Sequence, residues 1–174
     1  MIIAFPPCTY LSSAGIRHYS LRINSPENVA NRIVKRNAAA AFFLKFANAD
    51  CERIVIENPV GYMNTHYRKP DQITHPYYFG DPFKKRTCFW VKGVSTLEPT
   101  NILPEPKPIY ICDGEKRKGK KINWCEAMKT GKGKGTQEER AKARSKTFPG
   151  IAKAMAEQWG GELLHSRTSI GSDI

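Results

Sequence analysis

Two short apolar segments of the chain each end abruptly in residues that stop a strand or carry polar groups. Residues 2–5 run into Pro6 and Pro7, and residues 53–57 contain Ile-Val-Ile directly before a glutamate. Short apolar runs bounded in this way are typical of buried strands. Proline cannot donate to a strand ladder, so the first strand must end at Pro6. We therefore predict two buried strands whose ends deliver side chains to the edge of a sheet.

Between these segments, apolar residues recur at helical spacing. Ser25-Pro26-Glu27 provides a capping residue, a proline in the first turn and an acid near the positive end of the helix dipole. The pattern predicts a helix from residue 26 to about residue 48, with Arg32, Lys35 and Arg36 facing solvent. Strand, helix and strand in this order predict a βαβ unit with parallel strands and a right-handed crossover. The expected core positions of the helix are Val29, Ala30, Ile33, Val34, Ala38, Ala41, Phe42 and Ala47.

For the whole chain we predict one α/β domain over residues 1–163, followed by a polar tail over residues 164–174. We expect a mostly parallel sheet, a β-rich middle and a basic C-terminal helical segment. The expected segments are a polar loop over 9–24, an irregular stretch over 61–76, a strand over 87–91, a proline-rich connector over 97–108, an edge strand over 109–112, a basic loop over 113–135, a helix opened by the capping box of Thr136 and Glu139 that ends near residue 144, and a helix over 149–159.

Length and composition narrow the class of protein. The chain has 174 residues, and none of its apolar stretches approaches the ~20 residues that a membrane-spanning helix needs. The N-terminus does not resemble a secretory signal, so the five scattered cysteines are expected to be free thiols in the cytoplasm. Neither the cysteines nor the four histidines follow a metal-ligand spacing, so we expect no metal site.

Positive charge is concentrated in one part of the chain. There are 28 lysines and arginines against 16 aspartates and glutamates, a net charge of +12. Residues 115–146 alone contain twelve basic and four acidic residues. A run of this kind is either a solvated surface or a surface for a polyanion, and the high pI favours nucleic acid. Each lysine or arginine placed on a phosphate would release condensed counterions.

Four residues near the strand ends are candidates for chemistry. A single cysteine is most often a small buried hydrophobe, but Cys8 follows the first strand where side chains point into a cleft. Glu57 either caps a turn or, half-buried, has a raised pKa and donates a proton to a ring nitrogen. Asn58 follows it. Arg86 either belongs to a solvated charge run or binds a base carbonyl or a phosphate.

The residues at these positions resemble those of a known family. Phe5-Pro6-Pro7-Cys8, Glu57-Asn58-Pro59 and Lys85-Arg86-Thr87 resemble, in that order, three motifs of the cytosine-C5 DNA methyltransferases. Nearly the whole chain is similar to short phage and prophage DNA cytosine methyltransferase-like proteins. The recurring segments are residues 6–11, 57–59, 78–90 and 144–159.

The resemblance implies a truncated methyltransferase-like Rossmann sheet and a role for each motif. Cys8 would attack C6 of a flipped cytosine, Glu57 would bond to N3, and Asn58 would hold the loop around Pro6 and Pro7. Arg86 would bind the base carbonyl, and Pro6, Pro7 and Thr9 would contact the substrate. The expected DNA contacts are Arg17, Lys84, Lys85, Lys116, Arg117, Lys118, Lys120, Lys121, Lys132 and Lys134.

The methyl donor implied by the resemblance is S-adenosylmethionine. In the family the donor-binding strand, glycine loop and acidic residue precede the Pro-Pro-Cys segment, and Cys88 stands where a second arginine is common. We therefore expect that methyl transfer needs a protein partner for the donor. A homodimer is the other assembly that we expect. Two alternatives stay open: an inactive DNA-binding phage protein on the same scaffold that acts in counter-defence or regulation, and an enzyme of other nucleotide chemistry.

Overall fold

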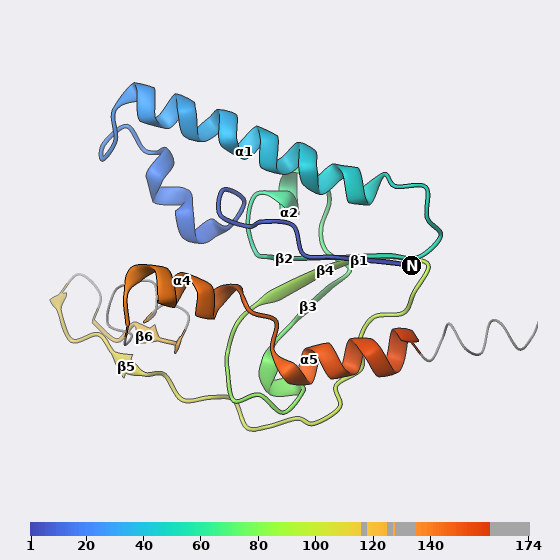
Figure 1. Ribbon diagram of the computed structural model, residues 1–174. Helices are drawn as coiled ribbons and strands as arrows, with labels where there is room; N and C mark the ends of the chain where they lie inside the picture. The colour runs from blue at the N-terminus through green and yellow to red at the C-terminus, as the bar shows by residue number, and fades with distance from the viewer. Residues whose placement is uncertain (116–117, 125–126, 128–134, 161–174) are drawn as a thin grey trace, which may run out of the picture. The chain divides into compact units, whose positions relative to one another are not determined.

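The computed structural model describes residues 1–115, 118–124, 127 and 135–160, and shows an α/β protein with a mixed sheet and few helices (Figure 1). The chain divides into two compact units. The first unit contains residues 1–74 and 86–96, and the second contains residues 75–85 and the described residues from 97 onward. The predicted tail over 164–174 lies outside the described residues. None of the described helices is both long enough and apolar enough to span a membrane.

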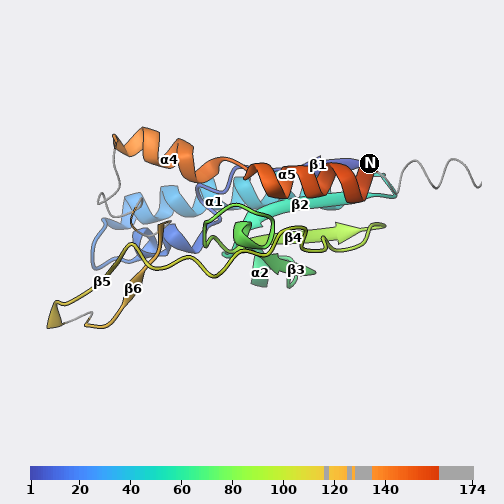
Figure 2. The ribbon, with the colours of Figure 1, turned by 90° about the horizontal axis from the view of Figure 1, so that it is seen from below.

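The first unit is built on a four-stranded sheet in the order β1-β2-β4-β3. Only β1 and β2 are parallel, while β4 runs antiparallel to both of its neighbours, as the pair β2 and β4 in Figure 2 illustrates. The prediction of a mostly parallel sheet was therefore wrong. A parallel neighbour needs a crossover connection, usually through a helix that runs back along the sheet, whereas the segment between β2 and β4 contains the short helices α2 (Met63–His66) and η2 (Pro76–Tyr78) and the short strand β3, none of which spans the sheet. The strands are β1 (Ile2–Ala4), β2 (Ile54–Pro59), β3 (Gln72–Thr74) and β4 (Thr87–Lys92).

The long helix α1 (Pro26–Ala47) connects β1 to β2 and confirms the predicted βαβ unit. The Ser25 hydroxyl accepts a hydrogen bond from the Asn28 backbone N–H at 3.3 Å, and Pro26 occupies the first turn. Both features satisfy or remove the donors that a helix start leaves unpaired. The helix therefore begins at the residue that the sequence predicts and ends one residue before the predicted end.

The face of α1 that packs on the rest of the unit is not the predicted one. Of the expected core positions only Val29 is buried, together with Ala40 and Phe43, whereas Val34 is 66 % exposed. Lys35 is exposed, as predicted. Arg32 and Arg36, which we expected in solvent, are half-buried against aromatic rings. The prediction was wrong because apolar residues surround this helix on nearly all sides, so that periodicity alone does not select one face.

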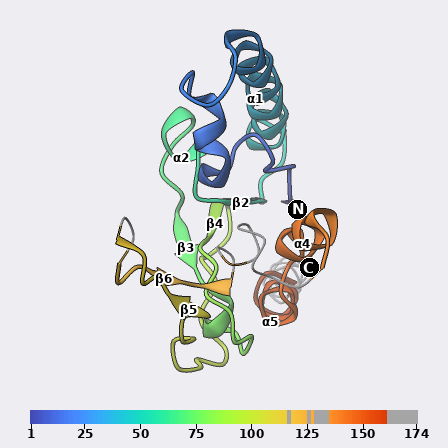
Figure 3. The same cartoon turned by 90° about the vertical axis from the view of Figure 1, so that its left-hand side faces the viewer.

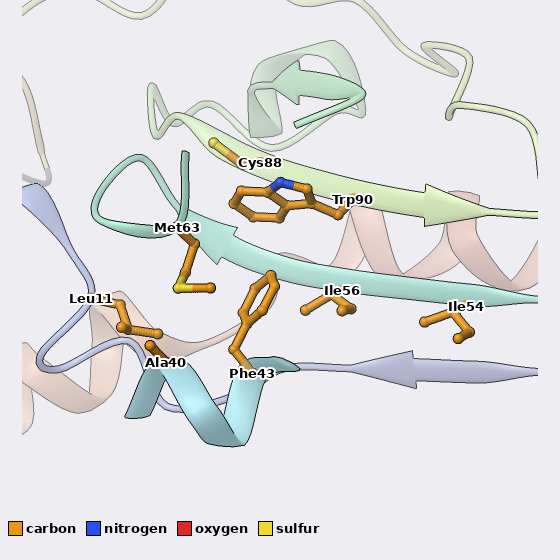
Figure 4. Packing of buried hydrophobic residues seen from close by; sticks show 8 residues of the cluster. All are labelled: Leu11, Ala40, Phe43, Ile54, Ile56, Met63, Cys88 and Trp90. Atoms are coloured by element: carbon orange, nitrogen blue, oxygen red, sulfur yellow. The ribbon is translucent and has the colours of Figure 1, made fainter. Parts of the chain in front are cut away.

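The core of the first unit lies between α1 and one face of the sheet (Figure 4). Phe43 points from α1 toward Trp90 of β4, and their rings meet edge to face with centroids 5.2 Å apart. Such pairs add to the burial of their apolar area. The cluster consists of Leu11, Ala40, Phe43, Ile54, Ile56, Met63, Cys88 and Trp90.

Three short elements of the first unit lie in segments that we expected to be irregular. They are the 3-10 helix η1 (Ser13–Tyr19), helix α2 (Met63–His66) and strand β3. Each has seven residues or fewer, which is too short for a hydrophobic period to develop. Two of them are next to the loop that carries Cys8: the Tyr19 hydroxyl of η1 donates to the Tyr10 carbonyl, and the N–H of Tyr62, which precedes α2, donates to the Leu11 carbonyl.

The second unit contains short helices and the two-stranded pair β5 (Tyr110–Ile111) and β6 (Lys121–Ile122), which lie side by side in Figure 3. Strand β5 lies within the segment predicted as an edge strand, but it pairs with β6 in a separate sheet instead of bordering the main one, and β6 falls in the segment predicted as a loop. Thr136 and Glu139 form the expected capping box of α4 (Gln137–Ser145). The other elements are η2 (Pro76–Tyr78), α5 (Pro149–Ala154) and the π-helix η4 (Met155–Trp159), which continues α5.

Candidate functional site

The loop that carries Cys8 is tied to the end of β2. The register of β1 and β2 pairs Ala4 with Ile56. Two residues further along each strand, the Asn58 side-chain N–H donates to the Pro6 carbonyl at 2.9 Å, and Asn58 is only 1 % exposed. Because this bond is buried, it fixes the start of the Cys8 loop beside the residue that follows Glu57. Asn58, which we expected to hold the loop around Pro6 and Pro7, thus contacts Pro6 directly.

The rest of the Cys8 loop is held by backbone hydrogen bonds. The Cys8 carbonyl accepts from Leu11 N–H at 3.0 Å and from Ser12 N–H at 2.9 Å, and the Leu11 carbonyl accepts from Tyr62 N–H at 2.7 Å. The chain approaches so closely here that a Cβ on Gly61 would lie 2.0 Å from the Leu11 carbonyl oxygen. The loop is therefore a defined turn, anchored at both ends.

The predicted substrate residues differ in exposure along this loop. Cys8 is a half-buried cysteine outside any disulfide, Pro6 is buried, and Pro7 and Thr9 are exposed. A half-buried thiol at a turn is accessible to a reactant, whereas a fully buried one is not. Of the expected substrate contacts, Pro7 and Thr9 can meet a ligand directly, and Pro6 serves through its carbonyl.

Glu57 and Asn58 lie on opposite faces of the sheet. Successive side chains of a strand alternate, and the antiparallel register places Glu57 opposite Phe89 and Asn58 opposite Cys88. Asn58 shares its face with the core under α1, while Glu57 is half-buried on the other face. Asn58 therefore contacts the Cys8 loop on the core face, while the Glu57 carboxyl group lies on the opposite face of the sheet.

The pKa of the Cys88 thiol is affected by charged residues near the ends of β2 and β4. Burial raises the pKa of the Cys88 thiol, and the negative charge of Glu57 raises it further. A hydrogen bond from the Asn64 amide to the sulfur, at 3.8 Å, and the positive charge of Arg86 lower the same pKa. Glu57 and Arg86 are thus both close enough to Cys88 to act on it electrostatically. With a raised pKa and 0 % exposure, Cys88 is a packing residue rather than a nucleophile.

One polar atom of the site has no partner. Within the described chain, the buried side-chain oxygen of Asn58 forms no hydrogen bond. Leaving a buried acceptor unpaired costs about 1–3 kcal/mol. The Asn58 side chain therefore stabilises the loop through its N–H and lowers the stability of the fold through its unpaired oxygen.

A cluster of arginines and tyrosines lies beside the Cys8 loop and was not predicted. The Arg36 guanidinium is 4.2 Å from the ring centroid of Tyr62 and 5.0 Å from that of Tyr19. The Arg32 guanidinium is 5.2 Å from the ring of Tyr10 and 5.1 Å from that of Tyr19. Stacking of this kind orders a guanidinium and leaves its positive charge uncompensated. We name Tyr10, Tyr19, Tyr62, Arg32 and Arg36 the Arg–Tyr cluster.

No carboxylate is paired with the Arg–Tyr cluster in the part of the chain that the structure describes. The Nε atoms of Arg32 and Arg36 are buried without a hydrogen-bond partner there. Residues 9–48 contain six lysines and arginines and one acidic residue, Glu27. This local excess of positive charge was the sequence signal for the Arg–Tyr cluster. It was overlooked because the excess over residues 115–146 is larger.

The predicted DNA-contacting residues have varied surroundings. Lys84 forms an ion pair with Glu105, and the Lys85 ammonium lies 5.6 Å from the ring centroid of Phe148. Arg17 is exposed and donates from Nε to His18 at 3.3 Å. Lys84 is therefore partly neutralised, unlike Arg17. Arg86, Lys118, Lys120 and Lys121 are exposed, whereas Lys116, Arg117, Lys132 and Lys134 lie outside the described residues.

The described residues do not fit S-adenosylmethionine. The family binds this donor with a glycine-bearing loop and an acidic residue on strands beside the Pro-Pro-Cys strand, but β1 pairs only with β2 among the described strands. Asp50 and Glu52 precede β2 and so lie at the opposite end of the strands from Cys8. We derive no step through the donor. Nor does the described part of the chain gather three or more potential metal ligands.

Comparison of the chain with models of protein families, with curated proteins and with solved structures gives no match. The function is therefore inferred from the residues and the geometry around Cys8.

Proposed function

We propose that this protein is related in function to the DNA cytosine-C5 methyltransferases and adds the Cys8 thiol to C6 of a cytosine extruded from DNA. The supporting observation is the buried hydrogen bond from Asn58 to the Pro6 carbonyl. It joins the loop of a half-buried thiol to the strand that carries Glu57. A nucleophile and an acid at one sheet edge are the two groups that addition to a pyrimidine ring requires.

In the proposed step the Cys8 thiol releases its proton to solvent, its sulfur forms a bond to C6, and the C5–C6 π bond breaks. The electron pair moves toward C5 and the ring amidine, while the Glu57 carboxyl donates a proton to N3. C5 then takes a proton from solvent and loses the original one. N3 returns its proton to the Glu57 carboxylate, and elimination of the Cys8 thiolate, which takes up a proton from solvent, restores cytosine. The base must leave the stack first, because C6 cannot be reached within a duplex.

The Arg–Tyr cluster provides a positively charged surface for the DNA backbone beside the reacting loop. Tyr10 belongs both to this cluster and to the turn that begins at Cys8. Guanidinium groups match phosphate oxygens in a bidentate geometry. Contacts at this position would fix the register of the DNA without reading its sequence.

Hydrogen exchange at C5 tests the addition step without a methyl donor. Duplex DNA incubated with the protein in D2O should yield 5-deuterocytosine, detected by mass spectrometry of the released nucleosides. The C8S variant should abolish the exchange, and E57Q should slow it by about 10²–10⁴-fold. The matched control is C51S, because Cys51 is also a half-buried cysteine of the first unit. Equal exchange by C8S and the unchanged protein would overturn the proposal.

A second candidate is a DNA-binding protein without chemistry, a phage factor that acts in counter-defence or regulation. The Arg–Tyr cluster favours it, because this cluster binds phosphates whether or not Cys8 reacts. Absence of C5 exchange together with salt-dependent DNA binding that C8S leaves unchanged would select this candidate. None of the four described cysteines forms a disulfide, which suits the reducing cytoplasm that we propose as its location.

A further inference from the structure

The Arg–Tyr cluster is a chain of alternating rings and guanidinium groups. Arg32 lies against the rings of Tyr10 and Tyr19, and Arg36 lies against the rings of Tyr19 and Tyr62. Each guanidinium is thus held by two aromatic rings, and both contact the same ring, that of Tyr19. Stacking on two rings fixes the position of a guanidinium before a ligand arrives, which lowers the entropy that binding costs.

Both guanidinium groups have donors that no described residue uses. A guanidinium carries five N–H donors and no acceptor. Arg32 and Arg36 form no hydrogen bond and no ion pair with another residue that the structure describes. Only their Nε atoms are both buried and unpaired, so the terminal nitrogens meet solvent. Like charges four residues apart on a helix also repel each other, and a bound anion would remove this repulsion.

Gly15 of η1 leaves the space that the Arg32 side chain occupies. A Cβ atom at residue 15 would lie 2.7 Å from Arg32 Nη2, well inside the normal contact distance. The nearest backbone atom, the Thr9 carbonyl oxygen, would be 3.7 Å away, which is an ordinary contact. Gly15 does not have a positive φ, so alanine can adopt its backbone conformation. A methyl group here would therefore displace the Arg32 guanidinium and leave the backbone and the net charge unchanged.

We propose that Arg32 and Arg36 bind two neighbouring phosphates of one DNA strand, one phosphate for each guanidinium. The two residues are four positions apart on α1, so they are separated by about 6 Å along the helix axis. Neighbouring phosphates of a strand have a comparable separation, and each guanidinium can meet phosphate oxygens with two N–H groups. We name Arg32 and Arg36 the phosphate clamp. For its ligand class, DNA, the phosphate clamp rests on the proposed function.

The phosphate clamp is joined to the Cys8 loop through two of the tyrosines that hold it. The Tyr19 hydroxyl donates to the Tyr10 carbonyl at 3.0 Å, and the Tyr62 N–H donates to the Leu11 carbonyl at 2.7 Å. Tyr10 and Leu11 belong to the turn that begins at Cys8. A strand bound by the phosphate clamp is therefore held at a fixed place relative to the Cys8 thiol, and we infer that this strand carries the cytosine that reacts.

The salt dependence of duplex binding, measured by fluorescence anisotropy of a labelled oligonucleotide, tests the phosphate clamp. Each neutralised phosphate contributes about −0.9 to the slope of log K against log salt concentration. R32Q and R36Q should each reduce the magnitude of this slope by about 0.9, and the double variant by about 1.8. The matched control is K45Q, which removes an exposed charge from the last turn of the same helix and should leave the slope unchanged. Equal losses of slope in K45Q and R36Q overturn the proposal, because they indicate a general basic surface.

G15A tests the phosphate clamp without removing a charge. It should weaken duplex binding nearly as much as R32Q, because both changes take the Arg32 guanidinium out of its place. The matched control is G114A, whose Cβ would meet no atom within 4 Å and which should bind like the unchanged protein. Circular dichroism melts will show that each variant is folded. Unchanged binding by folded G15A overturns the role of Arg32.

Two further measurements separate this proposal from its neighbours. Inorganic phosphate should compete with the duplex no better than chloride at equal ionic strength, and stronger competition would identify a site for free phosphate and overturn binding of a strand. The C8S variant should bind with an unchanged slope. Loss of slope in R32Q and R36Q without any C5 exchange by the unchanged protein would refute the proposed chemistry and support the phosphate clamp. C5 exchange that depends on Cys8, with no loss of slope in R32Q and R36Q, would refute the phosphate clamp alone.

Discussion

Replacing Asn58 by aspartate tests the buried hydrogen bond on which the site depends. In the unchanged protein the side-chain N–H lies 2.9 Å from the Pro6 carbonyl oxygen. In N58D an ionised carboxylate would instead face that oxygen at a position that is 1 % exposed. An uncompensated buried charge costs about 3–5 kcal/mol. Only the protonated carboxyl can donate to Pro6, so the folded variant should bind a proton there.

The pH dependence of N58D has a definite sign. Its folded-state pKa should lie above the unfolded value of about 3.9. The folded protein then holds a proton that the unfolded chain releases, so its stability is greatest at low pH and is lost as pH rises through the folded pKa. A rise of about two pKa units corresponds to about 2.7 kcal/mol. The deficit of N58D relative to the unchanged protein should shrink by about 1.2 kcal/mol between about pH 8 and pH 5, and by the full ~2.7 kcal/mol only below the unfolded pKa.

Urea denaturation followed by tryptophan fluorescence measures this difference at each pH. N58A is the matched control, because it also lacks the donor but cannot bind a proton. Its deficit, about 1–3 kcal/mol for the unpaired Pro6 carbonyl, should be reduced by loss of the unpaired Asn58 oxygen and should not vary with pH. If N58D and N58A follow parallel curves from about pH 5 to 8, position 58 is solvated and the anchor for the Cys8 loop does not exist.

Three further changes test the first unit. F43A should lower the free energy of unfolding by about 3–5 kcal/mol in chemical denaturation, because Phe43 is 0 % exposed and packs on Trp90; a loss below about 1 kcal/mol would contradict this packing. Burial raises the pKa of Asp71, but hydrogen bonds from Arg68 and from Val91 N–H outweigh burial and lower that pKa. D71N should therefore cost about 1 kcal/mol near neutral pH, measured by denaturation, and the difference should disappear as pH falls through the folded pKa of Asp71; a difference that persists in acid would exclude the charge as its cause. G61A should destabilise the unit by about 1–3 kcal/mol in a thermal melt, because its Cβ would lie 2.0 Å from the Leu11 carbonyl oxygen. The control is G114A, whose Cβ would have no atom within 4 Å and which should therefore have little effect.

Local signals in the sequence predicted the elements that local interactions determine. Ser25 and Pro26 fix the start of α1, and the capping box of Thr136 fixes the start of α4, because each satisfies donors within its own turn. The face of α1 could not be predicted in the same way. It depends on Tyr19 and Tyr62, which meet Arg36 only after folding. Contacts between distant segments leave no period in the sequence.

The candidate site divides along the same line. The strand ends predicted that Cys8 and Glu57 approach one sheet edge, because parallel neighbours bring their carboxyl ends together. Alternation along a strand places the neighbours Glu57 and Asn58 on opposite faces, but which of them faces the core under α1 depends on packing and could not be predicted. The Arg–Tyr cluster was missed for a related reason: a stacked arginine and a solvated one look alike in a sequence.

The antiparallel direction of β4, which the sequence did not predict, explains how Arg86 reaches the candidate site. In an all-parallel sheet only residues that follow a strand lie at the edge where Cys8 and Glu57 lie. Because β4 runs the other way, its first residue, Thr87, pairs with Pro59 at the last position of β2. Arg86 immediately precedes Thr87 and therefore lies at this edge, close enough to lower the pKa of the Cys88 thiol. The mixed sheet thus brings the Arg86 cation to the edge that already carries the Cys8 thiol and the Glu57 carboxyl group. If β4 were parallel to β2, Arg86 would lie at the opposite edge.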